Sequence, residues 1–193
     1  MIKTFFNLGL LAALTACGGG GDSTVVETTI LTSTSWTNNG VIPVKYAAPA
    51  QGGTNTSPQL TVSNLPSGTA TLAVIMDDES TPGCGTGANA CVHWNVFNLP
   101  ASKTSIAENE NLTMVSGVVL GKAYNGSVGY AGPNPPSQHT YNISVFALDA
   151  SAKAVPSTTQ TAVSYTRSQF ETLYNGKILG KVTLAGIFTP SVK

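Results

Sequence analysis

Short runs of β-branched and aromatic residues, separated by Gly, Pro, Asn and Ser, recur along the chain from Val25 onward. Such short apolar runs between turn residues are typical of many short β-strands. The pattern predicts strands at residues 41–46, 60–62, 70–76, 93–98, 116–120, 140–148 and 181–188. Because nothing repeats at a fixed period, we expect one all-β domain, a mostly antiparallel, Greek-key-like β-sandwich with one or two short helices.

Two of the expected strands differ from the others in their apolar content. Residues 72–76 read Leu-Ala-Val-Ile-Met, which is continuously apolar and predicts a strand that is buried on both faces. Residues 140–148 alternate less cleanly between apolar and polar positions. We expect both to be central strands.

One window, residues 166–174, has the pattern of a helix. It opens with Thr166 and Gln169 in the Thr-x-x-Gln spacing of a capping box, and it ends before Asn175 and Gly176. Phe170, Leu173 and Tyr174 would share one apolar face.

The first residues of the chain have the pattern of an export signal. Residue Lys3 precedes an apolar run at residues 5–14, which is too short for a membrane-spanning helix of about 20 residues. The run leads into Leu14-Thr15-Ala16-Cys17, which resembles the lipobox of bacterial lipoproteins. We expect a signal peptide at residues 1–16, a lipidated flexible tether at 17–27 and the folded domain at 28–193. A buried or reactive thiol at Cys17 is the alternative.

Lipid on Cys17 would attach the protein to a membrane as an exported lipoprotein of the cell envelope. Gly18, in place of Asp, resembles the residue that follows the lipidated cysteine in lipoproteins sent to the outer membrane. We therefore expect a protein that faces the periplasm from that membrane.

Charged side chains make up only 9% of the sequence, against about 25% in ordinary soluble proteins. Cleavage of the signal removes Lys3, one of nine basic side chains, and none of the nine acidic ones, which leaves a formal charge of −1. Binding of nucleic acid through a basic face is therefore not expected.

Two of the three cysteines, Cys84 and Cys91, remain after Cys17 is assigned to lipid. Export would place them in a compartment that permits disulfides, and we expect them to form one. A metal site is the weaker alternative, because no second Cys or His pair lies nearby in the sequence.

The residues able to perform chemistry are few. His93 and His139, the two histidines of the chain, stand at the start of expected strands, and Asp77 and Asp78 end the apolar strand. Strand ends are where sandwich folds commonly place binding residues. Three prolines in residues 130–141 would stiffen the loop before His139, although a simple Pro-rich turn would have the same composition.

Several distinctive blocks of residues occur along the chain: Ser57-Pro58-Gln59-Leu60, Leu65-Pro66-Ser67-Gly68-Thr69, Asp78 to Pro82, His93-Trp94-Asn95-Val96-Phe97-Asn98-Leu99-Pro100, Gly129-Tyr130-Ala131-Gly132-Pro133-Asn134-Pro135-Pro136, His139-Thr140-Tyr141 and Ala147-Leu148-Asp149. In their order and approximate spacing these blocks resemble the phosphatidylethanolamine-binding protein family, most closely its bacterial Raf kinase inhibitor-like branch. The resemblance covers residues 28–188.

The resemblance implies a β-sandwich with a small anion-binding pocket at one end. The residues that would line or support the pocket are Asp78, His93, Gly132, Pro133, His139 and Tyr141, with Pro82 shaping it. Ser80 and Asn134 depart from the family, which has Asp and often Cys at these positions.

The resulting hypothesis is a binding protein, without cofactor or metal, for a small anionic group: a phosphate, a phospholipid head group or a carboxylate. Imidazole N–H and phenol O–H groups are suitable donors to such anions. The alternative is a partner-binding or inhibitory module directed at a protease or an envelope component.

Two further alternatives use the same polar residues. Asp78 and the two histidines could act as general acid and base of a hydrolase, but residues 125–129 lack the first glycine of a Gly-x-Ser-x-Gly elbow. The same three side chains could form a two-histidine, one-carboxylate metal site.

Three neighbouring residues have simpler interpretations. Trp94 follows His93 directly, so it should face the opposite side of the strand and pack in the core. Trp36 fits the core or its rim. Asp77 should face away from Asp78 and serve as a turn or capping carboxylate.

Overall fold

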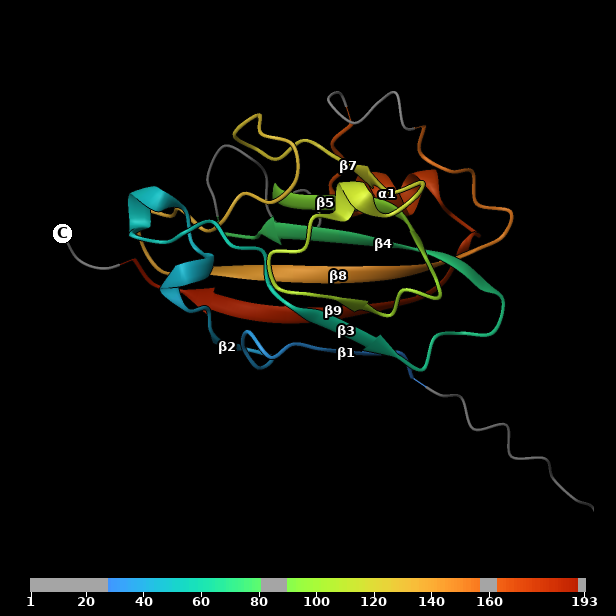
Figure 1. The fold of residues 1–193 in the computed structure, drawn as a ribbon, viewed down its shortest axis with the longest axis horizontal. Coiled ribbons are helices and arrows are strands. Elements are labelled where there is room, and N and C mark those ends of the chain that lie inside the picture. Colours follow the sequence, from blue (N-terminus) through green and yellow to red (C-terminus); the bar gives the residue numbers. More distant parts are fainter. Residues whose placement is uncertain (1–27, 81–89, 157–162, 191–193) are drawn as a thin grey trace, which may run out of the picture.

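The computed structural model describes residues 28–80, 90–156 and 163–190. Six strands form the larger sheet in the order β2 (Gly40–Val41), β9 (Ile178–Phe188), β8 (His139–Asp149), β4 (Thr69–Asp78), β5 (Cys91–Pro100) and β7 (Val119–Leu120). The smaller sheet has the order β1 (Ile30–Thr32), β3 (Leu60–Ser63) and β6 (Ser105–Ile106). All strand pairs are antiparallel except β2 with β9 (Figure 1). The expected all-β fold is confirmed.

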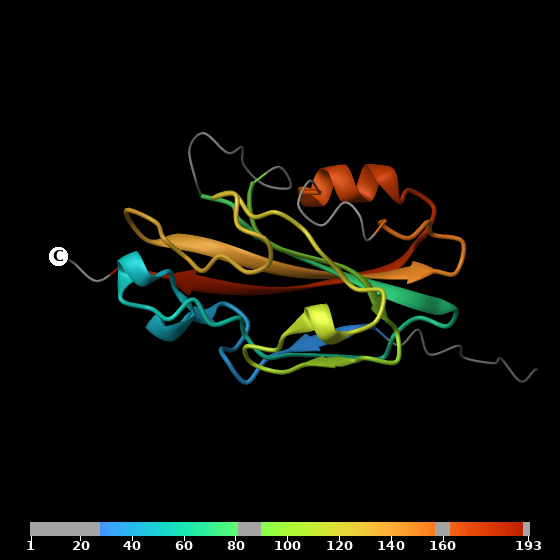
Figure 2. The same ribbon diagram turned by 45° about the horizontal axis from the view of Figure 1, so that its top comes forward.

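The elements lie in three layers. The larger sheet is in the middle, with the smaller sheet on one face and the helix α1 (Arg167–Leu173) on the other (Figure 2). Two hydrophobic cores fill the spaces between the layers, and the apolar run of β4 contributes to both. Leu72, Val74 and Met76 belong to the core between the sheets, whereas Ala73 and Ile75 belong to the core under α1. The prediction of a strand buried on both faces is confirmed.

The helix α1 begins with the expected capping box. Thr166 Oγ1 accepts a hydrogen bond from Gln169 N at 3.3 Å, and Gln169 Oε1 accepts one from Thr166 N at 3.0 Å. Phe170 is fully buried in the core under α1. Leu173 was expected on the same buried face but is 55% exposed, because it is the last residue of the short helix and lies beyond the edge of this core.

Two expected strands are much shorter than the pattern predicts. Of residues 41–46 only Val41 lies in a strand, and Pro43, which has no N–H to donate, is followed by a 3-10 helix at Val44–Tyr46. Of residues 116–120 only Val119–Leu120 is a strand, because Gly117 adopts a positive φ of 80° in the preceding turn. Short 3-10 helices also occur at Pro49–Gln51 and Leu112–Met114.

Several sequence-based predictions fall on residues outside the described ranges. They are the signal peptide and tether, lipid on Cys17, Pro82 and the Cys84 half of the expected disulfide. Cys91 begins β5 and is buried, and its bond to Cys84 stays a prediction. Within residues 28–80, 90–156 and 163–190, no helix is long and apolar enough to cross a membrane.

Candidate functional site

A β-bulge in β5 places His93. Met76 of β4 pairs with Trp94, but the next residue, Asp77, pairs with Val92, so His93 is an additional residue without an opposite partner. A bulge bends its strand and redirects a side chain. The ring of His93 thereby contacts Tyr141, which belongs to the same core as Trp94. Trp94 packs in the core as expected, but the strict alternation assumed for these two residues is wrong.

His93 lines a small cavity at one end of the larger sheet. Asp78 at the end of β4 and Tyr141 near the start of β8 are cross-strand partners, so they lie side by side with His139. The cavity has a volume of about 60 Å³ and is lined by Asp78, His93, Tyr124, Asn134, Pro135, Pro136, His139 and Tyr141. Pockets for drug-sized ligands measure about 300–1,000 Å³, so this one has room for a single small group.

The Nδ1 atom of His93 lies 2.7 Å from the carbonyl oxygen of Ala131. Because a carbonyl only accepts, Nδ1 carries the proton, and Nε2 of the neutral ring is left as an acceptor. Burial lowers the pKa of His93, which favours this neutral form in the empty cavity. Nε2 can donate a hydrogen bond only after the ring takes up a second proton.

His139 and Asp78 form a buried pair, with 2.8 Å between Nδ1 and Oδ2. Asp78 Oδ1 also accepts a hydrogen bond from Ser80 N at 2.9 Å, and Ser80 Oγ accepts one from Thr140 N at 3.3 Å. Ser80, which departs from the family pattern, therefore connects the ends of β4 and β8. The carboxylate fixes the orientation of His139.

Tyr141 brings a phenol to the cavity. Its hydroxyl is buried close to the Asp78 carboxylate and the Asn134 backbone, but it has no hydrogen bond of good geometry among the described residues. Burial, followed by the neighbouring Asp78 carboxylate, raises the pKa of Tyr141 well above its ordinary value, so the hydroxyl keeps its proton. A buried donor without an acceptor costs about 1–3 kcal/mol, and a ligand oxygen in the cavity would relieve that cost.

Tyr124, which the sequence did not single out, covers the other side of His93. The centroid of its ring is 4.6 Å from that of His93, whereas the Tyr141 ring stands perpendicular to the imidazole at 5.0 Å. Tyr124 is held there by a 2.8 Å hydrogen bond from its own N to Val92 O. No pattern in the sequence indicates this contact, because Tyr124 lies in a loop outside the expected strands.

Gly132 and Pro133 support the cavity without lining it. Gly132 N donates to Asn55 Oδ1 at 2.6 Å, and Pro133 O accepts from Ala48 N at 2.9 Å. A Cβ atom on Gly132 would come within 2.3 Å of Tyr46 O, so the two segments approach too closely for any side chain. These contacts fix the loop from which Asn134 and the following prolines reach the cavity.

Asp77 proves to have a different role from the expected turn or cap. It is fully buried on the face covered by α1, where Arg167 Nε donates to Asp77 Oδ2 and Arg167 Nη2 donates to Glu79 Oε1. Burial raises the pKa of Asp77 to about 6, although the Arg167 guanidinium opposes this shift. The adjacent carboxylates thus face opposite sides of the sheet, Asp77 toward α1 and Asp78 toward the cavity.

The described residues bring together no group of three or more His, Cys, Asp or Glu side chains with the spacing of a metal site. The cavity combines instead one buried His–Asp pair, a second imidazole and a phenol. With its two-sheet fold, the protein is therefore a β-protein of the class that has a small cavity lined by polar groups at the strand ends of its central sheet.

The sequence profile described as "Phosphatidylethanolamine-binding protein" matches residues 32–189, and the chain belongs to this family. Relatives include a UPF0098 protein of Aquifex aeolicus, 32% identical over 81% of this chain and 85% of the relative. Another UPF0098 protein, from Methanothermobacter thermautotrophicus, is 31% identical over 80% of this chain and 94% of its own.

Solved structures agree with this assignment. A putative phosphatidylethanolamine-binding protein homolog from Chlamydia trachomatis superimposes with a TM-score of 0.69, at 25% identity over 85% of this chain and 99% of that one. Escherichia coli YbcL has the same TM-score of 0.69 at 23% identity over 86% and 100%, and shares the fold.

Proposed function

We propose that this protein is an exported lipoprotein of the Raf kinase inhibitor-like branch that binds a small oxyanion in the histidine cavity. By histidine cavity we mean the 60 Å³ space at His93, His139, Asp78 and Tyr141. The observation that carries the proposal is the buried Tyr141 hydroxyl, which has no hydrogen bond of good geometry among the described residues, although Asp78 and the Asn134 backbone lie close to it, and which faces a space of the right size. Candidate ligands are phosphate, a phospholipid head group or a carboxylate.

An anion would complete the hydrogen bonds of the cavity. Tyr141 would donate its phenolic proton, and His93 would donate from Nε2 once the ring is protonated. Binding is therefore coupled to the uptake of a proton by His93, whose positive charge balances the anion. The contact with Asp78 holds the second imidazole, His139, in place.

The size of the cavity limits which part of a ligand can enter. One water needs roughly 10–15 Å³ of such space, so 60 Å³ corresponds to about four to six non-hydrogen atoms. A phosphate or carboxylate group fits this limit, with the rest of a larger molecule outside. Asn134, Pro135 and Pro136 would contact the ligand at the mouth.

The lining supports binding better than catalysis. The described residues around the cavity include neither a serine nor a cysteine that could serve as a nucleophile next to a histidine. We therefore propose no hydrolytic activity, and turnover of p-nitrophenyl phosphate or acetate that is lost in His139→Ala would contradict this part.

Calorimetric titration of the purified protein with phosphate and with phosphoethanolamine at pH 6 tests the proposal. We expect saturable binding of both, weakened about tenfold or more in Tyr141→Phe, since a hydrogen bond to a charged group contributes roughly 1.5–3 kcal/mol. His139→Ala should abolish binding. Tyr46→Phe is the matched control, because its hydroxyl donates to Glu108 and not into the cavity. No saturable heat at millimolar ligand, or equal affinities in Tyr141→Phe and wild type, would overturn the proposal.

The lipoprotein part rests on residues 14–17 and is tested separately. We expect the protein to fractionate with membranes and to incorporate labelled palmitate when expressed in a bacterium. Cys17→Ser should abolish both results. Incorporation that persists in this variant would refute lipidation at Cys17.

A further inference from the structure

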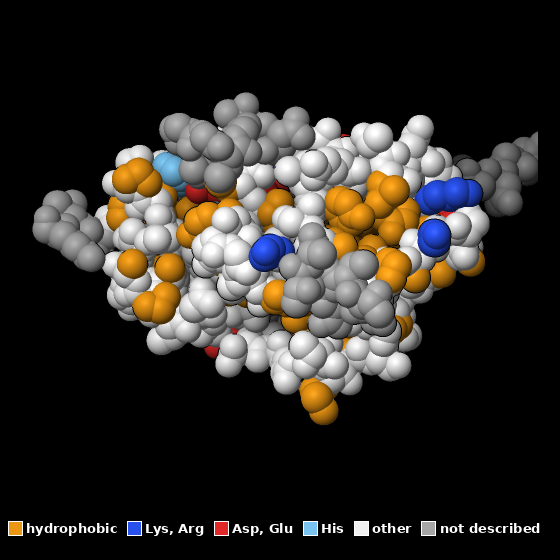
Figure 3. Space-filling view, turned by 90° about the horizontal axis from the view of Figure 1, so that it is seen from above, with side chains coloured by type: hydrophobic (Ala, Val, Ile, Leu, Met, Phe, Trp, Pro, Cys, Tyr) orange, Lys and Arg blue, Asp and Glu red, His pale blue; other side chains and the backbone are white. Residues whose placement is uncertain are grey.

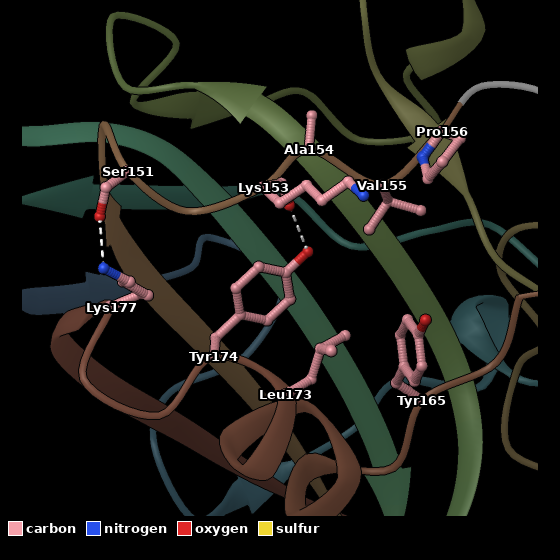
Figure 4. Close-up of a pocket in the computed structure, with 9 residues that line it drawn as sticks. All are labelled: Ser151, Lys153, Ala154, Val155, Pro156, Tyr165, Leu173, Tyr174 and Lys177. Atoms are coloured by element: carbon pink, nitrogen blue, oxygen red, sulfur yellow. Dashed lines mark hydrogen bonds between the residues drawn. The ribbon is translucent and has the colours of Figure 1, made fainter.

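A second and larger hollow lies beside α1, far from the histidines. Its volume is about 350 Å³, within the usual range for small-molecule pockets. It is lined by Ser151, Lys153, Ala154, Val155, Pro156, Tyr165, Leu173, Tyr174 and Lys177, and we call it the lysine groove. In Figure 4, Leu173 and Tyr174 lie between Lys177 at one end and Tyr165 at the other. On the face seen in Figure 3, an apolar patch flanked by basic side chains lies at the end opposite to a visible histidine.

The walls of the lysine groove are fixed by two asparagines of β5. Asn98 Nδ2 donates to Val155 O at 2.7 Å, and Asn98 Oδ1 accepts from Val155 N at 2.9 Å. Asn95 fixes the opposite wall with the same two kinds of hydrogen bond. Its Nδ2 donates to Tyr165 O at 3.2 Å, and its Oδ1 accepts from Tyr165 N at 2.8 Å. Each wall therefore has one residue with both backbone groups bonded to a single side chain. A groove held in this way is preformed, which lowers the entropy cost of binding.

The floor of the lysine groove is apolar and partly open. Val155 and Tyr174 are buried, and the Tyr174 hydroxyl is already used in a 2.8 Å hydrogen bond to Lys153 O. Leu173, the helix residue expected in the core, instead exposes 55% of its surface here. An exposed apolar surface within a concave, preformed site favours a ligand with an apolar part.

The charges at the rim are positive. Of the described lysines, Lys45, Lys103 and Lys181 each pair with a glutamate, whereas Lys153 and Lys177 have no carboxylate within salt-bridge distance among the described residues. Lys177 Nζ donates to Ser151 Oγ at 2.7 Å, and none of the described residues that line the groove is acidic. Asp149 lies nearby. The hydrogen bond from the Ser151 hydroxyl, and less strongly the charge of Lys177, lower the pKa of Asp149, so it stays ionised and moderates this potential.

We propose that the lysine groove is a second binding site, for a small amphiphile with an apolar chain or ring and one anionic head. The apolar part would lie on Leu173 and Tyr174, and the head would pair with the ammonium group of Lys153 or of Lys177, which lie on opposite sides of Tyr174 in Figure 4. Fatty acids and single-chain phosphorylated lipids share this chemistry. The site is independent of the anion proposed for the histidine cavity.

Titration of the purified full chain with decanoate, followed by calorimetry and by the methyl NMR signals of Leu173, tests this proposal. Decanoate should bind saturably and shift the Leu173 methyl signals. Acetate, which lacks the chain, and decyltrimethylammonium, which reverses the charge, should bind at least tenfold more weakly. Decyl phosphate in place of decanoate distinguishes a preference for a phosphate head from one for a carboxylate.

Charge-removing variants locate the site. Lys153→Gln and Lys177→Gln should each weaken decanoate binding about fivefold, the upper range for an exposed ion pair. Lys122→Gln is the matched control, because Lys122 has no carboxylate partner among the described residues and lies outside the groove. Equal affinity of the Lys153→Gln/Lys177→Gln double variant and wild type would overturn the proposal. So would a loss of decanoate binding in Tyr141→Phe, which would place the ligand in the histidine cavity.

Discussion

The histidine cavity and the lysine groove lie at opposite ends of β8 and differ in almost every physical property. β8 has 11 residues, and a strand rises about 3.3 Å per residue, so its ends are roughly 30 Å apart. The cavity holds about 60 Å³ with ionisable groups that are buried, whereas the groove holds about 350 Å³ with lysines at an open rim. The lowered pKa of His93 makes the anion site proposed for the cavity sensitive to pH, whereas the site proposed for the groove relies on lysines at its rim. One fold thus provides two candidate sites of different chemistry.

Both regions nevertheless depend on the same strand. β5 carries the bulge that presents His93, and it carries the asparagines that fix the groove walls. A second register shift, between the pairs Leu72–Leu99 and Val74–Val96, lies next to Asn98, whose φ is 57°. Irregularities in a central strand therefore position both sites.

The largest effect that separates the two regions should come from Phe170→Ala. Phe170 is fully buried and packs against Phe97 and Phe146 at centroid distances of 5.7 and 4.9 Å. We expect a loss of about 3–5 kcal/mol in the free energy of unfolding, measured in urea, because the truncation leaves a cavity under α1. Phosphate affinity at pH 6 should remain.

The exposed neighbour Leu173→Ala is the control for Phe170→Ala, and it should change stability by less than about 0.5 kcal/mol. A loss of phosphate binding in folded Phe170→Ala protein would show that the two regions are not independent.

The pH dependence of anion affinity sharpens the contrast. The lowered pKa of His93 favours a neutral ring in the empty cavity, so the ring must take up one proton when an anion binds. With one proton taken up, affinity falls up to tenfold per pH unit, or about a hundredfold from pH 6 to pH 8. Sulfate is the suitable probe, since its charge is constant in this range. Equal sulfate affinities at the two pH values would contradict proton coupling. Decanoate affinity at the lysine groove, read from the Leu173 methyl signals, should be unchanged between them.

The Asp77 carboxylate, on the α1 face, should affect stability and not binding. Its pKa is raised to about 6 in the folded protein from 3.8, so the folded state holds this proton more tightly than the unfolded state. The tighter binding of this proton stabilises the folded state below pH 4, and this stabilisation is lost as the pH rises through 6. The stability of wild type relative to Asp77→Asn should therefore fall by about 2–3 kcal/mol between pH 4 and pH 7. Urea unfolding at several pH values measures this difference in stability between wild type and Asp77→Asn. A difference that does not change with pH would contradict the raised pKa of the buried Asp77 carboxylate.

The smallest of these effects should come from the helix cap. Thr166→Ala removes the side-chain acceptor for Gln169 N, which typically lowers stability by about 1 kcal/mol. Thr172→Ala is a comparable helix substitution away from the cap. Thermal unfolding of both variants checks the prediction, which fails if Thr166→Ala is no less stable than Thr172→Ala.

Local patterns were sufficient to predict part of the fold. The apolar run of residues 72–76 predicts a strand that is buried on both faces, and the Thr166–Gln169 spacing predicts a helix cap. Both depend on neighbouring residues alone, and both are confirmed. Most of residues 41–46 do not form the expected strand, because Pro43 has no N–H to donate to a neighbouring strand. The β-branched and aromatic residues around it gave no sign of this. Asp77 was misassigned because its partner, Arg167, lies 90 residues further along the chain.

The candidate site was only partly accessible from the sequence. Asp78, His93 and His139 stand out in the sequence as chemically active residues at the ends of expected strands, and the resemblance to a family adds Tyr141. The structure brings these four residues together. The bulge that turns His93 toward Tyr141 breaks the period of two on which strand patterns depend. Tyr124 and most residues of the lysine groove lie in loops, where contacts between distant segments leave no periodic signal.

The protonation of His93 on anion binding is the most direct test of the proposed function. The chain has only two histidines, so a His139→Gln variant assigns their NMR signals. Imidazole ¹⁵N shifts should be followed at pH 7 while phosphate is added. We expect His93 to change from the neutral ring protonated at Nδ1 to the doubly protonated imidazolium, with the same saturation curve as the heat of binding. A His93 ring that stays neutral at saturating phosphate would contradict the proton-coupled oxyanion site.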